Sequence, residues 1–289
     1  HKVLLIEAGG SDRKFWIRTP IGYGMTFFDR NVNWCFDGEK DPGLNDREIY
    51  VPRGKVIGGS SSINAMVYCR GAKTDFDDWR DAGNPGWGWE DVKPAFEAIE
   101  RHVRKDGSID GKGPLTVSDR QNDYHPLKRH FIGAARDAGL PIADGTVGQG
   151  DEGFGPYLIN TRGGLRCSSA DAFLHPVKHR ANLTILTEAQ VTKILFEGKR
   201  AVGVSYRRDA MMQEARATRE VILSAGAIQS PHLLQLSGIG PGALLQNNGI
   251  DVLHANDAVG AHLEDHVGIN YYYRAKEPTL NAVLGTWAG

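Results

Sequence analysis

Short apolar runs, separated by glycine and polar residues, occur at the start of the chain and again from about residue 183, and they predict strands. Residues 3–6 form a continuous apolar run that ends at Glu7, with Gly9 and Gly10 just beyond it. Such a run is typical of a strand buried on both faces, as in a parallel sheet. From about residue 183 to residue 208 the chain has the alternating pattern of β-strands. Residues 197–199 predict the turn of a β-hairpin between two of them.

Two central segments show the spacing of amphipathic helices instead. Their apolar positions recur every three or four residues, at Val92, Phe96, Ile99 and Val103, and at Leu127, Phe131 and Ala135 before Gly139. Helices and strands therefore alternate irregularly, which predicts a mixed α/β fold. The glycine-rich stretch over residues 145–155 is the predicted flexible junction.

A strand, a turn and a helix are predicted around residue 226. Residues 221–223 form an apolar run, and Gly226 breaks it. Ser230 suits the N-cap of the next helix, Pro231 its first helical position, and Gly238 the residue after its last turn.

Composition narrows the classes of protein. The chain has 289 residues, 40% of them hydrophobic, and a net charge of −1. A large core is possible, and without a Lys/Arg block a nucleic-acid partner is not expected. No apolar run reaches the roughly 18 residues of a membrane span. Cys35, Cys69 and Cys167 are too few and too scattered for a disulfide framework or a zinc knuckle, so we expect a reducing, cytoplasmic location.

Residues 51–71 are the most informative segment. Gly58 and Gly59 leave the backbone bare, and the serines after them lead into good helix formers, which predicts main-chain N–H groups around an anionic ligand. The alternative is a turn that only caps a helix. Glu7 suits the same kind of ligand, because an acid after the second strand of a dinucleotide-binding unit accepts hydrogen bonds from the adenosine ribose.

The first strand and G-x-G-x-x-G turn of such a unit belong about 20 residues before this strand. The sequence starts at His1, so we interpret it as an interior fragment of a longer protein, truncated at both ends. Residues 280–289 likewise carry no stop signal that we can identify.

The chain resembles the N-terminal and middle part of glucose–methanol–choline (GMC) flavin oxidoreductases. Residues 53–70 resemble the first signature of that family, and residues 226–240 resemble the second. The resemblance is strongest to the branch of choline dehydrogenases and bacterial alcohol dehydrogenases or oxidases. It implies an FAD-binding, Rossmann-like fold of GMC type. Residues 1–75 and 183–270 would bind FAD, and residues 76–182 would form an inserted, helical segment on the substrate side.

The resemblance also implies which residues contact FAD. The matching positions are Gly58, Gly59, Ser60, Asn64, Ala65 and Val67 for the flavin and diphosphate, and Glu7, Val191, Ala225 and Gly226 for the adenosine part. The alternatives are that Val191 only fills the sheet, and that residues 225 and 226 form a structural crossover. Some members attach FAD through a His directly before the Asn, and Ile63 stands there in this chain, so noncovalent FAD is expected.

The implied activity is oxidation of a primary alcohol, choline-like or other, to the aldehyde, with hydride passing to flavin N5. The electron acceptor would be oxygen, a quinone or another carrier. The catalytic histidine of the family lies in a C-terminal part that this chain lacks, so no catalytic residue is assigned. We expect the isolated chain to retain little FAD and to show no turnover. The alternatives are an FAD-containing lyase, as in the hydroxynitrile lyase branch, and a noncatalytic flavin-binding fragment.

The histidine pairs do not predict a metal site. His262 and His266 have helical spacing, but Leu263 and Asp265 depart from both zinc-protease motifs, and this block resembles an Asp-His block of the family. Pro176 lies between His175 and His179, so we interpret these two as surface or packing residues. Residues 163–176 are expected to return the chain to the cofactor or substrate side.

Overall fold

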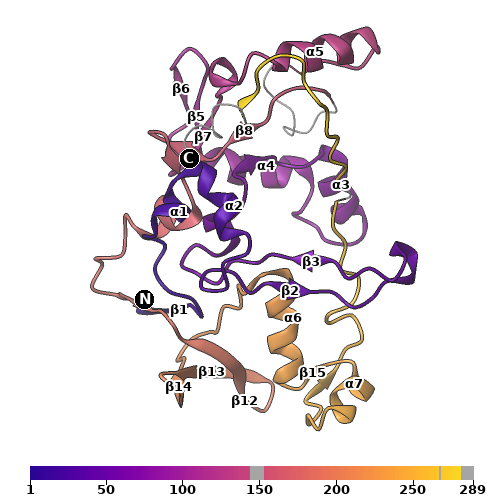
Figure 1. The fold of residues 1–289 in the computed structure, drawn as a ribbon. Coiled ribbons are helices and arrows are strands. Elements are labelled where there is room, and N and C mark those ends of the chain that lie inside the picture. The colour runs from indigo at the N-terminus through magenta and orange to yellow at the C-terminus, as the bar shows by residue number, and fades with distance from the viewer. Residues whose placement is uncertain (144–152, 267, 281–289) are drawn as a thin grey trace. The chain divides into compact units, whose positions relative to one another are not determined.

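The computed structural model describes residues 1–143, 153–266 and 268–280, which leaves most of the junction predicted over residues 145–155 outside the described residues. The chain forms two compact units. Unit 1 comprises His1–Ser11 and Arg180–Tyr271, and unit 2 comprises Asp12–His179 and Tyr272–Gly289. Figure 1 labels the elements of both units. Among the described residues, no helix has the length and apolar character needed to cross a membrane.

Unit 1 begins with a pair of parallel strands. Strand β1 (Val3–Ile6) pairs with β11 (Leu183–Leu186) in parallel register, as the apolar run predicts. The prediction that both faces are buried is wrong, because Val3 is 51% and Leu4 is 44% exposed. Within the described residues β11 is the only strand paired with β1, so one flank of the strand has no neighbour.

The predicted hairpin is confirmed as part of a larger antiparallel sheet. Strands β12 (Gln190–Glu197) and β13 (Arg200–Arg208) form the hairpin, with the turn at the predicted place. A third strand, β14 (Met211–Arg216), pairs with β13 and was not foreseen. All three can be followed in Figure 1. The core of this sheet includes the buried side chains of Ile194 and Tyr206.

The strand predicted at residues 221–223 is not present, and those residues are irregular. They have no strand partner in the described part of the chain, and Ile222 is 78% exposed. Helix α6 (Gly226–Leu236) starts four residues before the predicted N-cap and contains Pro231 in its interior. The prediction for its C-terminus is confirmed, because Gly238 follows the cap with a φ of +88°.

The rest of unit 1 packs on α6. Strand β15 (Ile239–Gly240) pairs in parallel with β16 (His254–Ala255), and helix α7 (Gly242–Asn247) connects them. The buried Ser237 hydroxyl donates to Leu233 O at 2.5 Å and accepts the Ile194 N–H at 2.8 Å. This hydroxyl therefore ties the end of α6 to the middle of β12.

Unit 2 is built on a mixed five-stranded sheet. The strand order is β4-β8-β7-β5-β6, and only the β5–β7 pair is parallel. The strands are β4 (Val67–Tyr68), β8 (Leu158–Ile159), β7 (Leu115–Ser118), β5 (Glu100–Val103) and β6 (Ile109–Asp110). Tyr68, Val117 and Leu158 form its apolar core.

Three helices accompany this sheet: α3 (Lys73–Asp81), α4 (Trp89–Ile99) and α5 (Lys128–Asp137). Both predicted helices are confirmed, except that Val103 lies in β5, beyond the end of α4. Helices α3 and α4 pack through aromatic rings, with the centroid of Phe76 5.6 Å from Trp89 and 5.9 Å from Phe96. The two helices lie side by side in Figure 1.

The start of unit 2 has short elements around a second apolar cluster of Ile17, Val32, Val56 and Ile63. The helical turns are α1 (Phe15–Arg18), η1 (Pro20–Gly22), α2 (Tyr23–Thr26), η2 (Pro42–Leu44) and η3 (Gly59–Ser62). A further turn, η4 (Gln121–Asp123), lies between β7 and α5. The small strands are β2 (Phe36–Asp37) with β3 (Tyr50–Val51), and β9 (Thr161–Arg162) with β10 (Leu165–Arg166). A π-helical turn, η5 (Ala170–Leu174), follows β10.

Candidate functional site

The Gly58–Gly59 turn of unit 2 rests on the second apolar cluster. Val56 is 0% and Ile63 is 5% exposed, so both ends of the turn are fixed in the core. The two glycines have φ values of +88° and +56°, which side chains with a Cβ adopt only with strain. A Cβ on Gly58 would collide with the Ser62 hydroxyl, whereas one on Gly59 would meet nothing within 4 Å. Open space therefore lies directly beside the Gly59 backbone.

The helix expected after the serines is not formed. Residues 59–62 make a single 3-10 turn, and the chain then turns into β4 through Met66, whose φ is +63°. Asn64 directs this second turn, because its side-chain oxygen accepts the Met66 N–H at 3.0 Å. A turn this short has no helix dipole of consequence, so the predicted helix is wrong and a helix N-terminus cannot help to hold an anion here. The contact of Gly58 and Gly59 with a cofactor stays a prediction.

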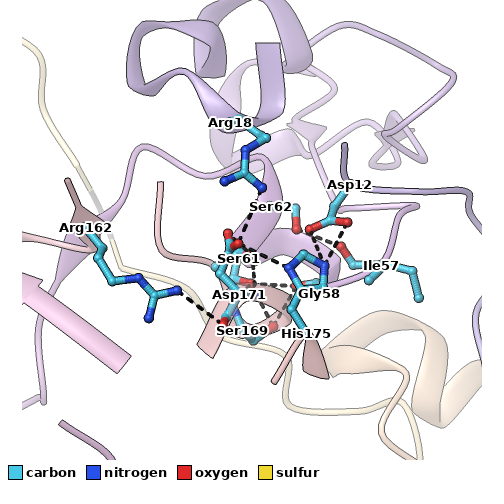
Figure 2. A network of polar contacts seen from close by, with 11 residues as sticks. Asp12, Arg18, Ile57, Gly58, Ser61, Ser62, Arg162, Ser169, Asp171 and His175 are labelled. Carbon is cyan, nitrogen blue, oxygen red and sulfur yellow. Dashed lines mark hydrogen bonds and ion pairs between the residues drawn. The ribbon is translucent and has the colours of Figure 1, made fainter. Parts of the chain in front are cut away.

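Serine hydroxyls cross-link this turn to a segment more than 100 residues later, as Figure 2 shows. Ser61 Oγ donates to Gly58 O at 2.6 Å and accepts the Ser169 N–H at 2.9 Å. Ser169 Oγ donates to the same carbonyl at 3.0 Å. Residues 163–176 thus return to the Gly58 turn, and that this is the cofactor or substrate side stays a prediction. These serines are structural.

Four predicted contact residues in the segment that follows are accessible. Ser60, Asn64, Ala65 and Val67 are exposed, whereas Ser62, Ile63, Met66 and Tyr68 are buried. Ser60 also accepts the Gly54 N–H on its hydroxyl at 3.0 Å. We refer to these four exposed residues as the exposed strip.

Arg166 was missed by the sequence analysis. It is 2% exposed and reaches three acceptors: Ile17 O at 2.8 Å, Ser61 O at 3.1 Å and Asn64 Oδ1 at 2.8 Å. Burial lowers its pKa to about 10, and Asp171 opposes this effect in part. The only signal in the sequence was a lone arginine between apolar and small residues, which does not distinguish a buried guanidinium from an exposed one.

A second polar cluster joins Asp12, Asp171 and His175. Nδ1 of His175 lies 3.2 Å from Asp171 Oδ1, and its Nε2 lies 3.1 Å from Asp12 Oδ2. The three side chains are close enough to hold a metal ion. However, each imidazole nitrogen already faces a carboxylate, and Arg18 lies 3.5 Å from Asp171 (Figure 2). Hydrogen bonds and ion pairs thus account for the cluster. His175 is a bracing residue, and only His179 is on the surface as predicted.

A third cluster surrounds Glu100, which is 1% exposed on β5. Tyr68, Arg70 and His102 all contact its carboxylate, with Arg70 Nε at 2.8 Å and His102 Nε2 at 2.7 Å. Burial favours the neutral acid, but hydrogen bonds from His102, Arg70 and Tyr68 outweigh it and hold the pKa of Glu100 at about 2. Burial and Glu100 together raise the pKa of Tyr68. The cluster holds β4, and so the end of the exposed strip, to the sheet.

In unit 1, Glu7 lies at the carboxyl end of β1 as predicted, half-buried. Its Oε1 accepts the Gly9 N–H at 2.7 Å, which closes the turn after the strand. The Ala189 N–H donates to Glu7 O at 2.9 Å, so the acid lies close to the start of β12, where Val191 pairs with Tyr206. Glu7 and Val191, two of the four residues predicted to contact the adenosine part of FAD, therefore lie near each other.

The other two adenosine-side residues begin α6. Ala225 and Gly226 are exposed, and the Ala225 N–H donates to Ser230 Oγ at 3.0 Å. Gly226 has a φ of +85°, and a Cβ there would meet nothing within 4 Å. The residues at the end of the chain that resemble the Asp-His block, 262–266, form no helix, so the helical spacing of His262 and His266 has no structural counterpart.

An acid at the carboxyl end of a parallel strand is a feature of α/β dinucleotide-binding folds, and unit 1 has one in Glu7. The sequence model described as GMC oxidoreductase matches residues 4–268. The chain therefore belongs to the GMC oxidoreductase family, as the two signatures predict. Members of this family bind FAD.

Two bacterial relatives make the likeness more specific. The chain is 40% identical over 288 residues to an oxygen-dependent choline dehydrogenase of Photobacterium profundum, covering 99% of this chain and 51% of the relative. It is 42% identical to an alcohol dehydrogenase [acceptor] of Pseudomonas putida, covering 96% of this chain and 51% of that one. The chain spans about half the length of the curated relatives it matches. It is thus choline and alcohol dehydrogenase-like.

Solved structures confirm the mixed α/β fold of the family. Pyridoxine 4-oxidase from Mesorbium loti superposes with a TM-score of 0.81 at 37% identity, covering 88% of this chain and 50% of its own. An FAD-dependent oxidoreductase from Chaetomium thermophilum gives a TM-score of 0.79 at 35% identity, with 88% and 46% covered.

Proposed function

We propose that the protein is an FAD-dependent oxidoreductase that acts on the CH–OH group of a primary alcohol, choline-like or other, and yields the aldehyde. The observation that carries the proposal is the similarity of 99% of the chain, at 40% identity, to an oxygen-dependent choline dehydrogenase. The likeness to an alcohol dehydrogenase [acceptor] supports the same class of substrate. Oxygen, a quinone or another carrier would receive the electrons.

The described residues fit an FAD. Gly59 and Gly226 both leave open space beside a bare backbone, which a large ligand can fill. Buried Arg166 Nη2 has no hydrogen-bond partner in the described part of the chain, as expected of a donor near a ligand site. The exposed strip of Ser60, Asn64, Ala65 and Val67 supplies polar and apolar contacts together, the combination that a flavin ring requires.

We assign the isoalloxazine and diphosphate to Gly58, Gly59 and the exposed strip. The adenosine part is assigned to Glu7, Val191, Ala225 and Gly226. Glu7 would accept hydrogen bonds from the ribose hydroxyls. The side chain at position 63 is a buried isoleucine without a nucleophilic atom, which supports noncovalent binding. The division into FAD-binding residues 1–75 and 183–270 and substrate-side residues 76–182 follows from the same assignment.

The flavin supplies the hydride-accepting chemistry when bound. The residues of this chain bind and orient it: the braced Gly58 turn fixes the backbone, and Asn64 presents a polar group at the accessible strip. No residue of this chain is assigned as the base that takes the proton of the alcohol.

The test is to purify the full-length protein, record its visible spectrum, and add primary alcohols, choline among them, without oxygen. Bound flavin whose absorbance bleaches with an alcohol is the expected result. Flavin that stays oxidised with every alcohol would favour the lyase or the noncatalytic alternative. A protein that binds no FAD even when FAD is supplied would contradict the proposal.

A further inference from the structure

We propose that Arg166 is a positioning residue that locks the Asn64 carboxamide as a hydrogen-bond donor toward an electron-rich edge of the flavin. This inference rests on the proposed function and adds a residue to it. It assigns a direction to Asn64, whose amide has both a donor and an acceptor end.

The orientation of the amide follows from its hydrogen bonds. Asn64 Oδ1 accepts the Met66 N–H at 3.0 Å and Arg166 Nη1 at 2.8 Å. Two donors point at this oxygen, and flipping the amide would place its N–H groups against them. The Asn64 Nδ2 group has no hydrogen-bond partner in the described residues, and the residue is exposed. The side chain therefore offers only donors to a ligand.

Arg166 is itself held rigidly enough to impose this orientation. Its Nε donates to Ile17 O and its Nη1 to Ser61 O, so the guanidinium is attached to α1 and to η3 as well as to Asn64. A planar guanidinium with three fixed acceptors leaves little freedom to the group that it orients. The residue is thus the link between the apolar cluster under the turn and the exposed strip.

The charge of Arg166 is unusual for a buried group. It forms no ion pair with a carboxylate in the described part of the chain, and its buried Nη2 has no partner there. Asp171 compensates this buried charge only in part, and a more negative ligand nearby relieves the remaining cost of burial. A flavin becomes more electron-rich when it is reduced, so this charge, acting with the Asn64 donor, should favour the reduced form and raise the reduction potential.

The experiment uses the full-length protein and two readouts, the FAD dissociation constant and the flavin reduction potential from dye-coupled titration. Arg166→Met should weaken FAD binding roughly tenfold, about the upper value of one hydrogen bond between neutral groups, and lower the potential. Arg166→Lys should recover part of the lost reduction potential, because lysine keeps the positive charge but lacks the planar guanidinium with its several N–H donors. Asn64→Leu should reproduce the loss, and because it also removes the acceptor of the Met66 N–H, Asn64→Asp is measured beside it, which keeps that acceptor, removes the donor and should also weaken FAD binding.

A double mutant separates positioning from a direct role. If Arg166 acts through Asn64, adding Arg166→Met to Asn64→Leu should change FAD binding by much less than it does in the wild type. The control is Arg162→Met. Arg162 is exposed, its one hydrogen bond within the described residues is to Asp171 O at 3.4 Å, and its loss should leave both readouts unchanged. If Arg166→Met fails to fold, Arg166→Lys and Asn64→Leu decide the question by the same readouts.

Unchanged FAD affinity and potential in the folded Arg166 and Asn64 variants would overturn the inference, and so would additive effects in the double mutant. These results would leave the proposed function standing, because the wild type would still bind flavin. A wild-type protein without flavin would instead overturn the proposed function and the inference together.

Discussion

The two glycine turns of this chain look alike in sequence but differ in how the structure supports them. The Gly58 turn in unit 2 is anchored at Val56 and Ile63, braced by Ser61 and Ser169, and backed by Arg166. The Gly226 turn in unit 1 follows an irregular segment with Ile222 78% exposed. A glycine signature therefore reports backbone freedom, whereas rigidity comes from contacts with distant segments.

The largest expected effect is on the buried ion pair that holds β4, the strand after the Gly58 turn. Glu100→Gln should lower the free energy of unfolding by about 4 kcal/mol, because Arg70 loses its buried ionic partner. Chemical denaturation of the full-length protein measures this. The control is Glu97→Gln, whose partner Lys93 lies 3.8 Å away on the surface of α4 and whose loss should cost less than about 1 kcal/mol. Equal losses in the two variants would contradict this account of the support.

The same carboxylate predicts a pH dependence. The pKa of Glu100 is lowered to about 2 in the folded protein, so its stabilisation is complete above the unfolded value of about 4.3. It should be lost progressively as the pH falls from there toward 2. Wild type and Glu100→Gln should therefore converge in stability in acid. A constant difference between their unfolding midpoints from pH 6 to pH 2.5 would show that the carboxylate is not responsible.

The two turns should respond differently to an added methyl group. Gly58→Ala should cost about 3 kcal/mol, because the left-handed φ is strained and the Cβ meets Ser62. Gly226→Ala has almost the same φ but open space, so it should cost only about 1 kcal/mol. Thermal unfolding measures both. The comparison fails if Gly226→Ala is as damaging as Gly58→Ala.

The serine brace should have the smallest effect. Ser169→Ala removes one hydrogen bond to Gly58 O and one contact with Ser61, and should cost about 1 kcal/mol. The control Ser108→Ala changes an exposed serine in the turn between β5 and β6 and should cost about 0.5 kcal/mol or less. A similar melting temperature for the two variants would mean that the brace adds nothing to the turn.

Local patterns were enough to predict much of the fold. Helix α5, most of α4, the β12–β13 hairpin and the parallel direction of β1 all follow from residue spacing within one segment. The strand predicted at residues 221–223 failed because strand formation depends on a partner, which a single apolar run does not reveal.

In the candidate site, too, local sequence predicts single residues but not their partners. Ten contact residues were named from the strand pattern and the resemblance to the family, and their individual roles remain predictions. The structure adds what joins them: Arg166 beneath Asn64 and Ser169 beside Gly58. Both lie about 100 residues from their partners in sequence, so only the folded chain identifies them. Likewise, the serines were predicted to precede a helix, but their hydroxyls stabilise a 3-10 turn instead.

The central claim is that FAD fills the open space beside Gly59. Gly59→Ala and Gly198→Ala form a matched pair, because the φ values are +56° and +58° and neither Cβ would meet an atom within 4 Å. Backbone strain should therefore be equal in the two full-length variants, while only Gly59→Ala places a methyl group at the proposed cofactor site. The measurement is FAD affinity by flavin fluorescence titration. We predict at least roughly tenfold weaker binding for Gly59→Ala and wild-type binding for Gly198→Ala. Equal FAD affinity in both variants and the wild type would contradict the account.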